Sequence, residues 1–140
     1  MYEIEKSQIP LNFYFHIECK RLGSPISSGK LTLKYVKDGI RRFIDESHRY
    51  GQHTQSGAMI GYLEDMTRNE IYQEVNAEIE AVKQALLPPS KITPLLLSQA
   101  GWQDNAASRL SNNLERSFPI TPFTLWHFWV DLRNRYPRTH

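Results

Sequence analysis

The fold is decided by one stretch near the start of the chain, which reads Phe13-Tyr14-Phe15-His16-Ile17-Glu18-Cys19-Lys20. Successive side chains of a β-strand point to opposite faces, so this alternation of residues predicts a half-buried strand. One face would carry Phe13, Phe15, Ile17 and Cys19 into a core, and the other would carry Tyr14, His16, Glu18 and Lys20. A carboxylate and an ammonium group then stand side by side on one surface, which is useful where a divalent metal and a phosphate meet.

The composition predicts one globular domain that spans residues 1–140. Hydrophobic residues make up 40% and charged residues 23%, which is ordinary for a soluble protein. A net charge of +2 and a pI of about 8.7 permit nucleic-acid binding without arguing for it. The one cysteine excludes an internal disulfide framework and favours a reducing cytoplasm. Residues 1–6 lack the pattern of a signal peptide, and no apolar run is long enough to predict a membrane helix.

The first half of the chain predicts a hairpin followed by a parallel crossover. Residues 2–5 alternate like a short strand, and the proline-containing stretch 8–12 would turn the chain into the strand of residues 13–20. An apolar stripe then predicts a helix over residues 35–47, in which Gly39 would permit close packing on the sheet. Residues 57–63 are apolar without alternation, which is typical of a strand covered on both faces. Strand, helix and buried strand in this order predict a parallel pair.

The second half contains a clear helix start and several ambiguous segments. Thr67-Arg68-Asn69-Glu70 is a capping box, and the helix that it opens would continue to about Leu87, before two prolines. Residues 92–97 would form an edge strand because they contain Pro94. The polar residues 101–117 predict a loop with at most a helical turn. Residues 123–133 fit both periods, and a helix is favoured.

Short motifs along the chain agree with one known pattern when they are taken together. They are Ile17-Glu18-Cys19-Lys20-Arg21-Leu22, Tyr35-Val36, Gly39-Ile40, Arg42-Phe43, Tyr50-Gly51, Met59-Ile60-Gly61-Tyr62, the looser segment Ser111 to Arg116, and Leu125 to Leu132. From residue 13 onward the chain resembles the PD-(D/E)xK nuclease superfamily, and within it a group of small prokaryotic proteins.

The resemblance implies an α/β (α+β) domain of the restriction-endonuclease-like type, in which helices flank a mixed sheet. It also implies that Glu18 binds Mg²⁺ or Mn²⁺ and that Lys20 assists the nucleophile or steadies the phosphate. The chemistry is sound, because hard cations prefer carboxylate oxygens and an ammonium group stabilises transition-state charge. The family's motif also has an aspartate on the preceding strand, but no aspartate precedes Asp38 here. Glu5, or Glu3 in its place, would have to supply the second carboxylate.

Several basic residues are candidates for contact with a polynucleotide. Lys37, Arg41 and Arg42 would follow a DNA backbone, and the alternative is a solvated helix face. His16 shares the face of Glu18 and is either a site residue or a partly buried strand histidine. His48 and His53 lie in one loop. For both we favour the role of ordinary loop residues over metal binding.

The remaining candidates are favoured as structural. Cys19 is expected to pack inertly in the core. The side chains of Ser111, Asn112 and Arg116 could touch a phosphate, although an exposed loop is favoured for them. The rings of Trp126 and Trp129 are expected in the core rather than as platforms for bases.

The sequence thus predicts a Mg²⁺-dependent DNA nuclease in which Glu18 and Lys20 are catalytic and Glu18 and Glu5 hold the metal. The alternative is an inactive protein of the same fold that binds DNA or a protein partner. A third interpretation is a structural or assembly subunit with an exposed hairpin edge. DNA is the expected partner, a homodimer or a partner protein is also considered, and no membrane is involved.

Overall fold

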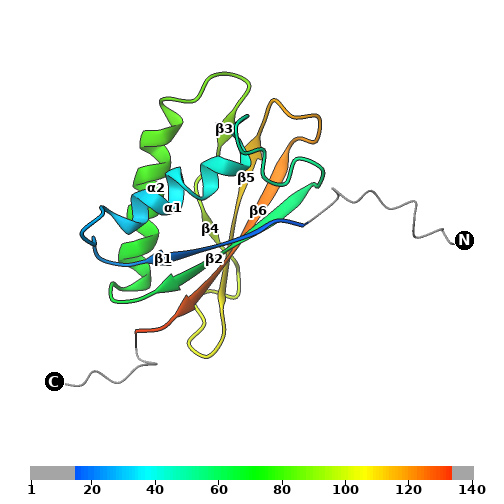
Figure 1. Ribbon diagram of the computed structural model, residues 1–140. Helices are drawn as coiled ribbons and strands as arrows, with labels where there is room; N and C mark the ends of the chain where they lie inside the picture. The colour runs from blue at the N-terminus through cyan, green and yellow to red at the C-terminus, as the bar shows by residue number, and fades with distance from the viewer. Residues whose placement is uncertain (1–14, 134–140) are drawn as a thin grey trace, which may run out of the picture.

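A computed structural model describes residues 15–133 of the chain. Within this range, one six-stranded mixed sheet has the order β1-β2-β6-β5-β3, and β4 pairs with β5. The elements are β1 (Ile17–Leu22), α1 (Leu31–Lys37), the 3₁₀ helix η2 (Ile40–Phe43), β2 (Ser56–Leu63), α2 (Arg68–Lys83), β3 (Lys91–Ile92), β4 (Leu96–Leu97), β5 (Ser108–Glu115) and β6 (Phe123–Asp131). Both α-helices pack together on the same side of the sheet (Figure 1). The prediction of an α/β (α+β) fold with a mixed sheet and helices is confirmed.

The predicted parallel crossover is confirmed. β1 and β2 are parallel, with Glu18 opposite Met59 and Lys20 opposite Gly61. β6 lies on the other side of β2 and is also parallel to it, whereas β5 runs antiparallel to β6. The predicted hairpin partner in residues 2–5 lies outside the described residues. β1 therefore has one described neighbour and forms an edge of the sheet.

The prediction of which β1 face enters the core is wrong. The side chains of Ile17 and Cys19 are exposed, and those of Glu18 and Lys20 are half-buried. The reason is that the helices cover only the face that carries the even-numbered residues of β1, where Leu22 is fully buried. Periodicity could separate the two faces of the strand, but it could not say which one the helices would cover.

The predicted helix over residues 35–47 has different bounds. Helix α1 begins at Leu31 and ends at Lys37, and η2 follows after Gly39. The break falls beside Gly39, where a Cβ atom would stand 2.4 Å from both the Met59 Cε atom and the Tyr35 carbonyl oxygen, so only glycine fits this close approach to the sheet. The apolar stripe still serves the core, since Val36, Ile40 and Phe43 are fully buried.

Helix α2 confirms the capping-box prediction. The Thr67 side chain accepts a hydrogen bond from the Glu70 backbone N–H, and the Glu70 carboxylate accepts one from the Thr67 backbone N–H. The apolar stripe of Ile71, Val75 and Ile79 is fully buried. The helix ends at Lys83, a few residues earlier than predicted.

The predictions for the second half of the sheet are mostly wrong. Residues 108–115, predicted as a loop, form β5, and residues 123–131, favoured as a helix, form β6. The polar residues Ser108 and Asn112 lie on the buried face of β5 and hide its alternation. The predicted edge strand over residues 92–97 forms as two short strands, β3 and β4, on either side of Pro94.

Candidate functional site

Strand β1 brings His16, Glu18 and Lys20 to one face at the edge of the sheet. The three residues are half-buried on the side that the helices cover. The side chain of Glu18 is 21% exposed and that of His16 is 30% exposed, so water and a ligand can reach both. No ion pair joins Lys20 to another residue in the range 15–133. The sequence prediction that Glu18 and Lys20 share one surface is therefore confirmed for the described chain.

The imidazole of His16 is held from several sides. Its Nε2 atom lies 2.9 Å from the Oε2 atom of Glu18. The ring stacks on the Tyr50 ring with 3.9 Å between centroids and meets the Phe43 ring edge-on at 5.4 Å. When the Nε2 N–H donates to Glu18, the Nδ1 atom is the acceptor nitrogen of the ring.

The segment that carries Tyr50 is held in place by Arg116. The guanidinium donates to the carbonyl oxygens of Phe43 and Tyr50, each at 3.2 Å, and to Gly51 at 3.3 Å. It also lies 4.0 Å from the centre of the Phe123 ring. The expectation of an exposed loop at Arg116 is wrong, because this residue is only 2% exposed. Burial and the nearby charge of Arg49 lower the pKa of Arg116 to about 10, so the guanidinium remains charged at neutral pH.

A pocket opens beside His16 in the loop between η2 and β2. Its volume is about 340 Å³, and its lining includes His16, His48, Tyr50 and His53. The imidazole of His48 is backed by the Asp45 carboxylate, with the Nδ1 atom 3.0 Å from Oδ1. His48 and His53, which the sequence predicts as ordinary loop residues, thus line the same pocket as His16. The sequence held a signal for this pocket in Tyr50-Gly51, flanked by histidines, but no pattern in the sequence connected that loop to β1.

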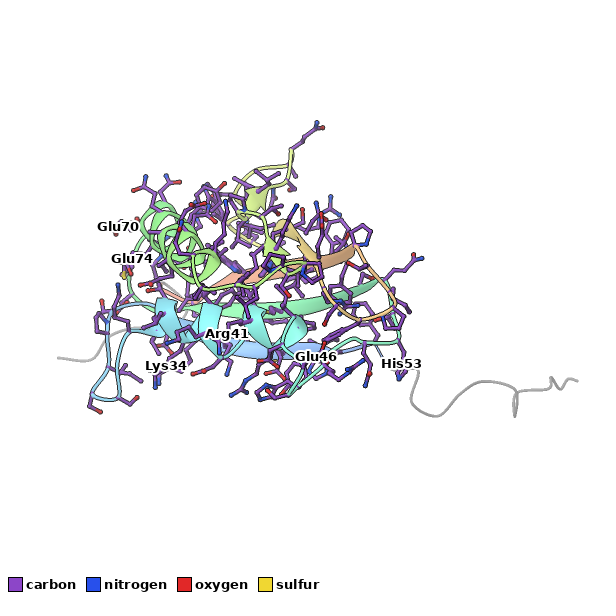
Figure 2. All side chains as sticks on the ribbon, turned by 90° about the horizontal axis from the view of Figure 1, so that it is seen from above. Lys34, Arg41, Glu46, His53, Glu70 and Glu74 are labelled. Atoms are coloured by element: carbon purple, nitrogen blue, oxygen red, sulfur yellow. The ribbon has the colours of Figure 1, made fainter. Side chains whose placement is uncertain are left out.

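The predicted nucleic-acid-binding residues lie in two places. Lys37 and Arg41 line a different pocket, of about 220 Å³, between α1 and α2, together with Glu78. Figure 2 shows Lys34, Arg41, Glu46 and His53 in a row along α1, η2 and the loop that follows. Arg42 is half-buried, and its carbonyl oxygen accepts the Tyr50 backbone N–H. Of the predicted contact residues, only His16 adjoins Glu18.

The described residues offer a partial set of ligands for Mg²⁺. Glu5 and Glu3 lie outside the described residues, so Glu18 stands as the one carboxylate of its face of β1. No group of three histidine, cysteine, aspartate or glutamate side chains in the range 15–133 is arranged to hold a metal. Mg²⁺ usually keeps several waters and takes one or two carboxylates plus substrate phosphates, so Glu18 alone would hold this ion poorly without a second carboxylate.

A second histidine, His127, lies deep in the core and belongs to a closed polar network. Its Nδ1 atom accepts from the Tyr35 hydroxyl at 2.7 Å, and its Nε2 N–H donates to the Asn112 Oδ1 atom at 2.8 Å. The Trp129 indole N–H donates to the Tyr35 oxygen at 3.1 Å. Burial lowers the pKa of His127 to about 3, so the ring is neutral. This network stabilises the core and offers nothing to a ligand.

The remaining predicted candidates are also placed by the sheet. Asn112 lies in the core on β5, so it is not the exposed loop residue that was favoured, and Ser111 is half-buried on the opposite face of that strand. The ring of Trp129 is buried as predicted, but Trp126 is only half-buried. Cys19 is exposed, which contradicts the prediction of a core position.

Comparisons with known proteins return nothing for this chain: no family model, no curated protein and no solved structure matches it. No helix in the described part of the chain is long and apolar enough to cross a membrane.

Proposed function

We propose that the protein is a Mg²⁺- or Mn²⁺-dependent DNA nuclease of the PD-(D/E)xK type, located in the cytoplasm. The observation that carries the proposal is the half-buried face on which Glu18 and Lys20 stand two residues apart, beside the pocket lined by His16 and Tyr50. A carboxylate and an ammonium group in such a position can serve a cation and a phosphate together.

Each residue of this face has a specific role in the proposal. Glu18 would hold the metal. The metal would polarise a phosphate oxygen and activate a water molecule as the nucleophile. Lys20 would offset the charge that develops on the scissile phosphate. The bond from His16 to Oε2 would fix the orientation of the Glu18 carboxylate, and Oε1 would be the oxygen that binds the metal. Glu5 is the proposed source of a second carboxylate.

Cleavage of supercoiled plasmid, with Mg²⁺ or Mn²⁺ added, tests the proposal. We expect nicking by the wild type that stops on chelation and falls at least ~100-fold in Glu18→Gln and in Lys20→Met, as for loss of groups that act in the transition state. Arg21→Gln is the matched control, because Arg21 lies on the same strand but on the opposite face, in an exposed pair with Glu64. If the wild type cuts no form of DNA with either metal, the catalytic proposal is wrong.

A second candidate is a non-catalytic protein of this fold that binds DNA or a protein partner. It is favoured by the finding that Glu18 is paired with His16, with no metal cluster among residues 15–133. Fluorescence anisotropy with a labelled duplex separates the two candidates. Binding that weakens with salt but survives in Glu18→Gln, without any cleavage, supports this candidate. Charge reversal at Lys37 and Arg41 tells whether the pocket between the helices takes part.

A further inference from the structure

One face of the sheet has no helix over it among the described residues. Helices α1 and α2 pack against each other on the opposite side, above the fully buried side chains of Met59, Leu125 and Trp129 (Figures 1 and 2). We call the uncovered side the open face. Its side chains come from the alternate residues of each strand, which include Ile17 on β1 and Ile60 on β2.

The strand register places the apolar side chains of β1, β2 and β6 side by side on the open face, with Ala58 buried among them and the polar Ser111 and Arg109 next to them on β5. One row across the strands contains Ile17, Ala58, Trp126, Ser111 and Leu96. The next row places Cys19 beside Ile60, then Phe128 and then Arg109. Side chains on one face of paired strands stand close enough for direct contact, so the apolar groups adjoin one another.

The exposed apolar side chains of the molecule are concentrated here. Five large hydrophobic residues are exposed among the described residues, and three of them, Ile17 (53%), Leu96 (65%) and Phe128 (36%), belong to the open face. Single exposed apolar residues are normal on a protein surface, but a contiguous patch marks an interaction site.

The direction of the strands also argues that the open face is covered. β1, β2 and β6 are mutually parallel, and sheets made only of parallel strands are almost always buried on both faces, so in this mixed sheet the argument applies to its parallel part. Strand spacings of about 4.8 Å give the apolar centre roughly 300 Å². That is a fitting centre for an interface in which each partner buries roughly 800 Å², the remainder being a polar rim.

The rim of the open face carries both signs of charge. Arg21 is bound to Glu64 at 2.8 Å along one side, and Arg109 lies 5.5 Å from the centre of the Trp126 ring toward the other side, where Glu115 follows on the same strand. A rim that carries both signs of charge does not repel a second copy of the same surface. Two copies related by a two-fold axis then bring no block of like charges together.

We propose that two copies of this chain associate through their open faces, with the two sheets packed face to face. Trp126, Phe128 and Ile60 would form the centre of the interface, because aromatic and large apolar groups dominate interface energies. The His16–Glu18–Lys20 face lies on the other side of each sheet and stays accessible in the dimer. The inference is therefore independent of the proposed nuclease function.

Sedimentation velocity of the full chain at increasing concentration tests the dimer. We expect the wild type to sediment as twice the 16.4 kDa of the chain and Phe128→Glu to sediment as a monomer. Ile17→Lys is a second variant, at a more exposed position, in case Phe128→Glu fails to fold. Leu87→Glu is the matched control and should remain dimeric, since Leu87 is 79% exposed but lies after α2, away from the open face.

The single cysteine provides an independent readout, because Cys19 is exposed on the open face. In a dimer its reaction with a thiol reagent should slow at least ~10-fold as protein concentration rises through the dissociation constant, and it should stay fast in Phe128→Glu. A wild type that is monomeric at every concentration overturns the proposal. In that event a reactive Cys19 indicates a bare face, and a protected Cys19 indicates that another part of the same chain covers it.

Discussion

His127 and His16 both lie on the helix-covered side of the sheet, but the two imidazole rings differ in burial and in the charge of their hydrogen-bond partners. His127 is fully buried between the Tyr35 hydroxyl and the Asn112 amide, and both of its nitrogens are used. His16 lies at the edge of the sheet, is 30% exposed, and has a carboxylate as its partner. Neutral partners and full burial make a structural histidine, whereas a charged partner and an open pocket leave a ring that can respond to a ligand.

Arg116 holds the loop whose Tyr50 ring stacks on His16, and its removal should have the largest effect on stability. In Arg116→Met the carbonyl oxygens of Phe43, Tyr50 and Gly51 lose a shared donor, so we expect the free energy of unfolding to fall by about 3–5 kcal/mol. Urea unfolding measures this loss. Arg109→Met, at an exposed position on β5, the strand that ends just before Arg116, should change it by less than ~0.5 kcal/mol. Equal effects of the two substitutions would contradict the role assigned to Arg116.

Loss of the buried histidine should destabilise the fold strongly. His127→Leu leaves the Tyr35 hydroxyl and the Asn112 side chain without their shared partner, at a cost of about 2–4 kcal/mol. His16→Leu should cost less than ~1 kcal/mol, because the His16 ring is partly solvated. Urea unfolding measures both losses. If His127→Leu and His16→Leu lose equal unfolding free energy, the distinction between a structural and a site histidine is wrong.

Acid should act mainly through the buried ring. Because burial lowers the pKa of His127 from 6.5 to about 3, the unfolded chain takes up a proton that the folded protein excludes. This contribution to stability is intact above about pH 6.5 and is lost as the pH falls toward 3. Each pH unit in that window removes up to about 1.4 kcal/mol, which gives about 2–3 kcal/mol near pH 4.5.

The acid effect is measured as the difference in unfolding free energy between neutral pH and about pH 4.5. His127→Leu lacks the titrating ring, so its loss should be smaller than that of the wild type by the same amount, about 2–3 kcal/mol. Carboxylates elsewhere in the chain titrate in both proteins and cancel in this difference. Identical pH dependence in the two proteins would mean that the buried ring is not responsible.

The smallest expected effect is at the site histidine. His16→Gln keeps a donor near Glu18 but loses the imidazole stacked on Tyr50, so we expect plasmid nicking to fall about 10-fold, or about 1.4 kcal/mol. The free energy of unfolding should change by less than ~1 kcal/mol. A variant that nicks at the wild-type rate would place His16 outside the working site.

Local patterns in the sequence settled several elements in advance. The capping box at Thr67 and the apolar run at residues 57–63 each rest on interactions among near neighbours, and a helix and a strand form there, although Ile60 and Tyr62 are half-buried and the strand is not covered on both faces as predicted. Glu18 and Lys20 share a face because the period of a strand is two. The ambiguous stretch Phe123–Asp131 shows the limit, since both periods fit it and only its pairing with β2 and β5 makes it a strand.

The sequence by itself determined which residues share a strand face and where helix α2 begins, because backbone periodicity and capping act over a few residues. Tertiary structure alone decided which face of β1 the helices cover, that Cys19 is exposed, and that Arg116 is buried beneath the Tyr50 loop. It also brought the His48 loop beside His16. These outcomes depend on contacts between segments dozens of residues apart, and no spacing within one segment encodes them.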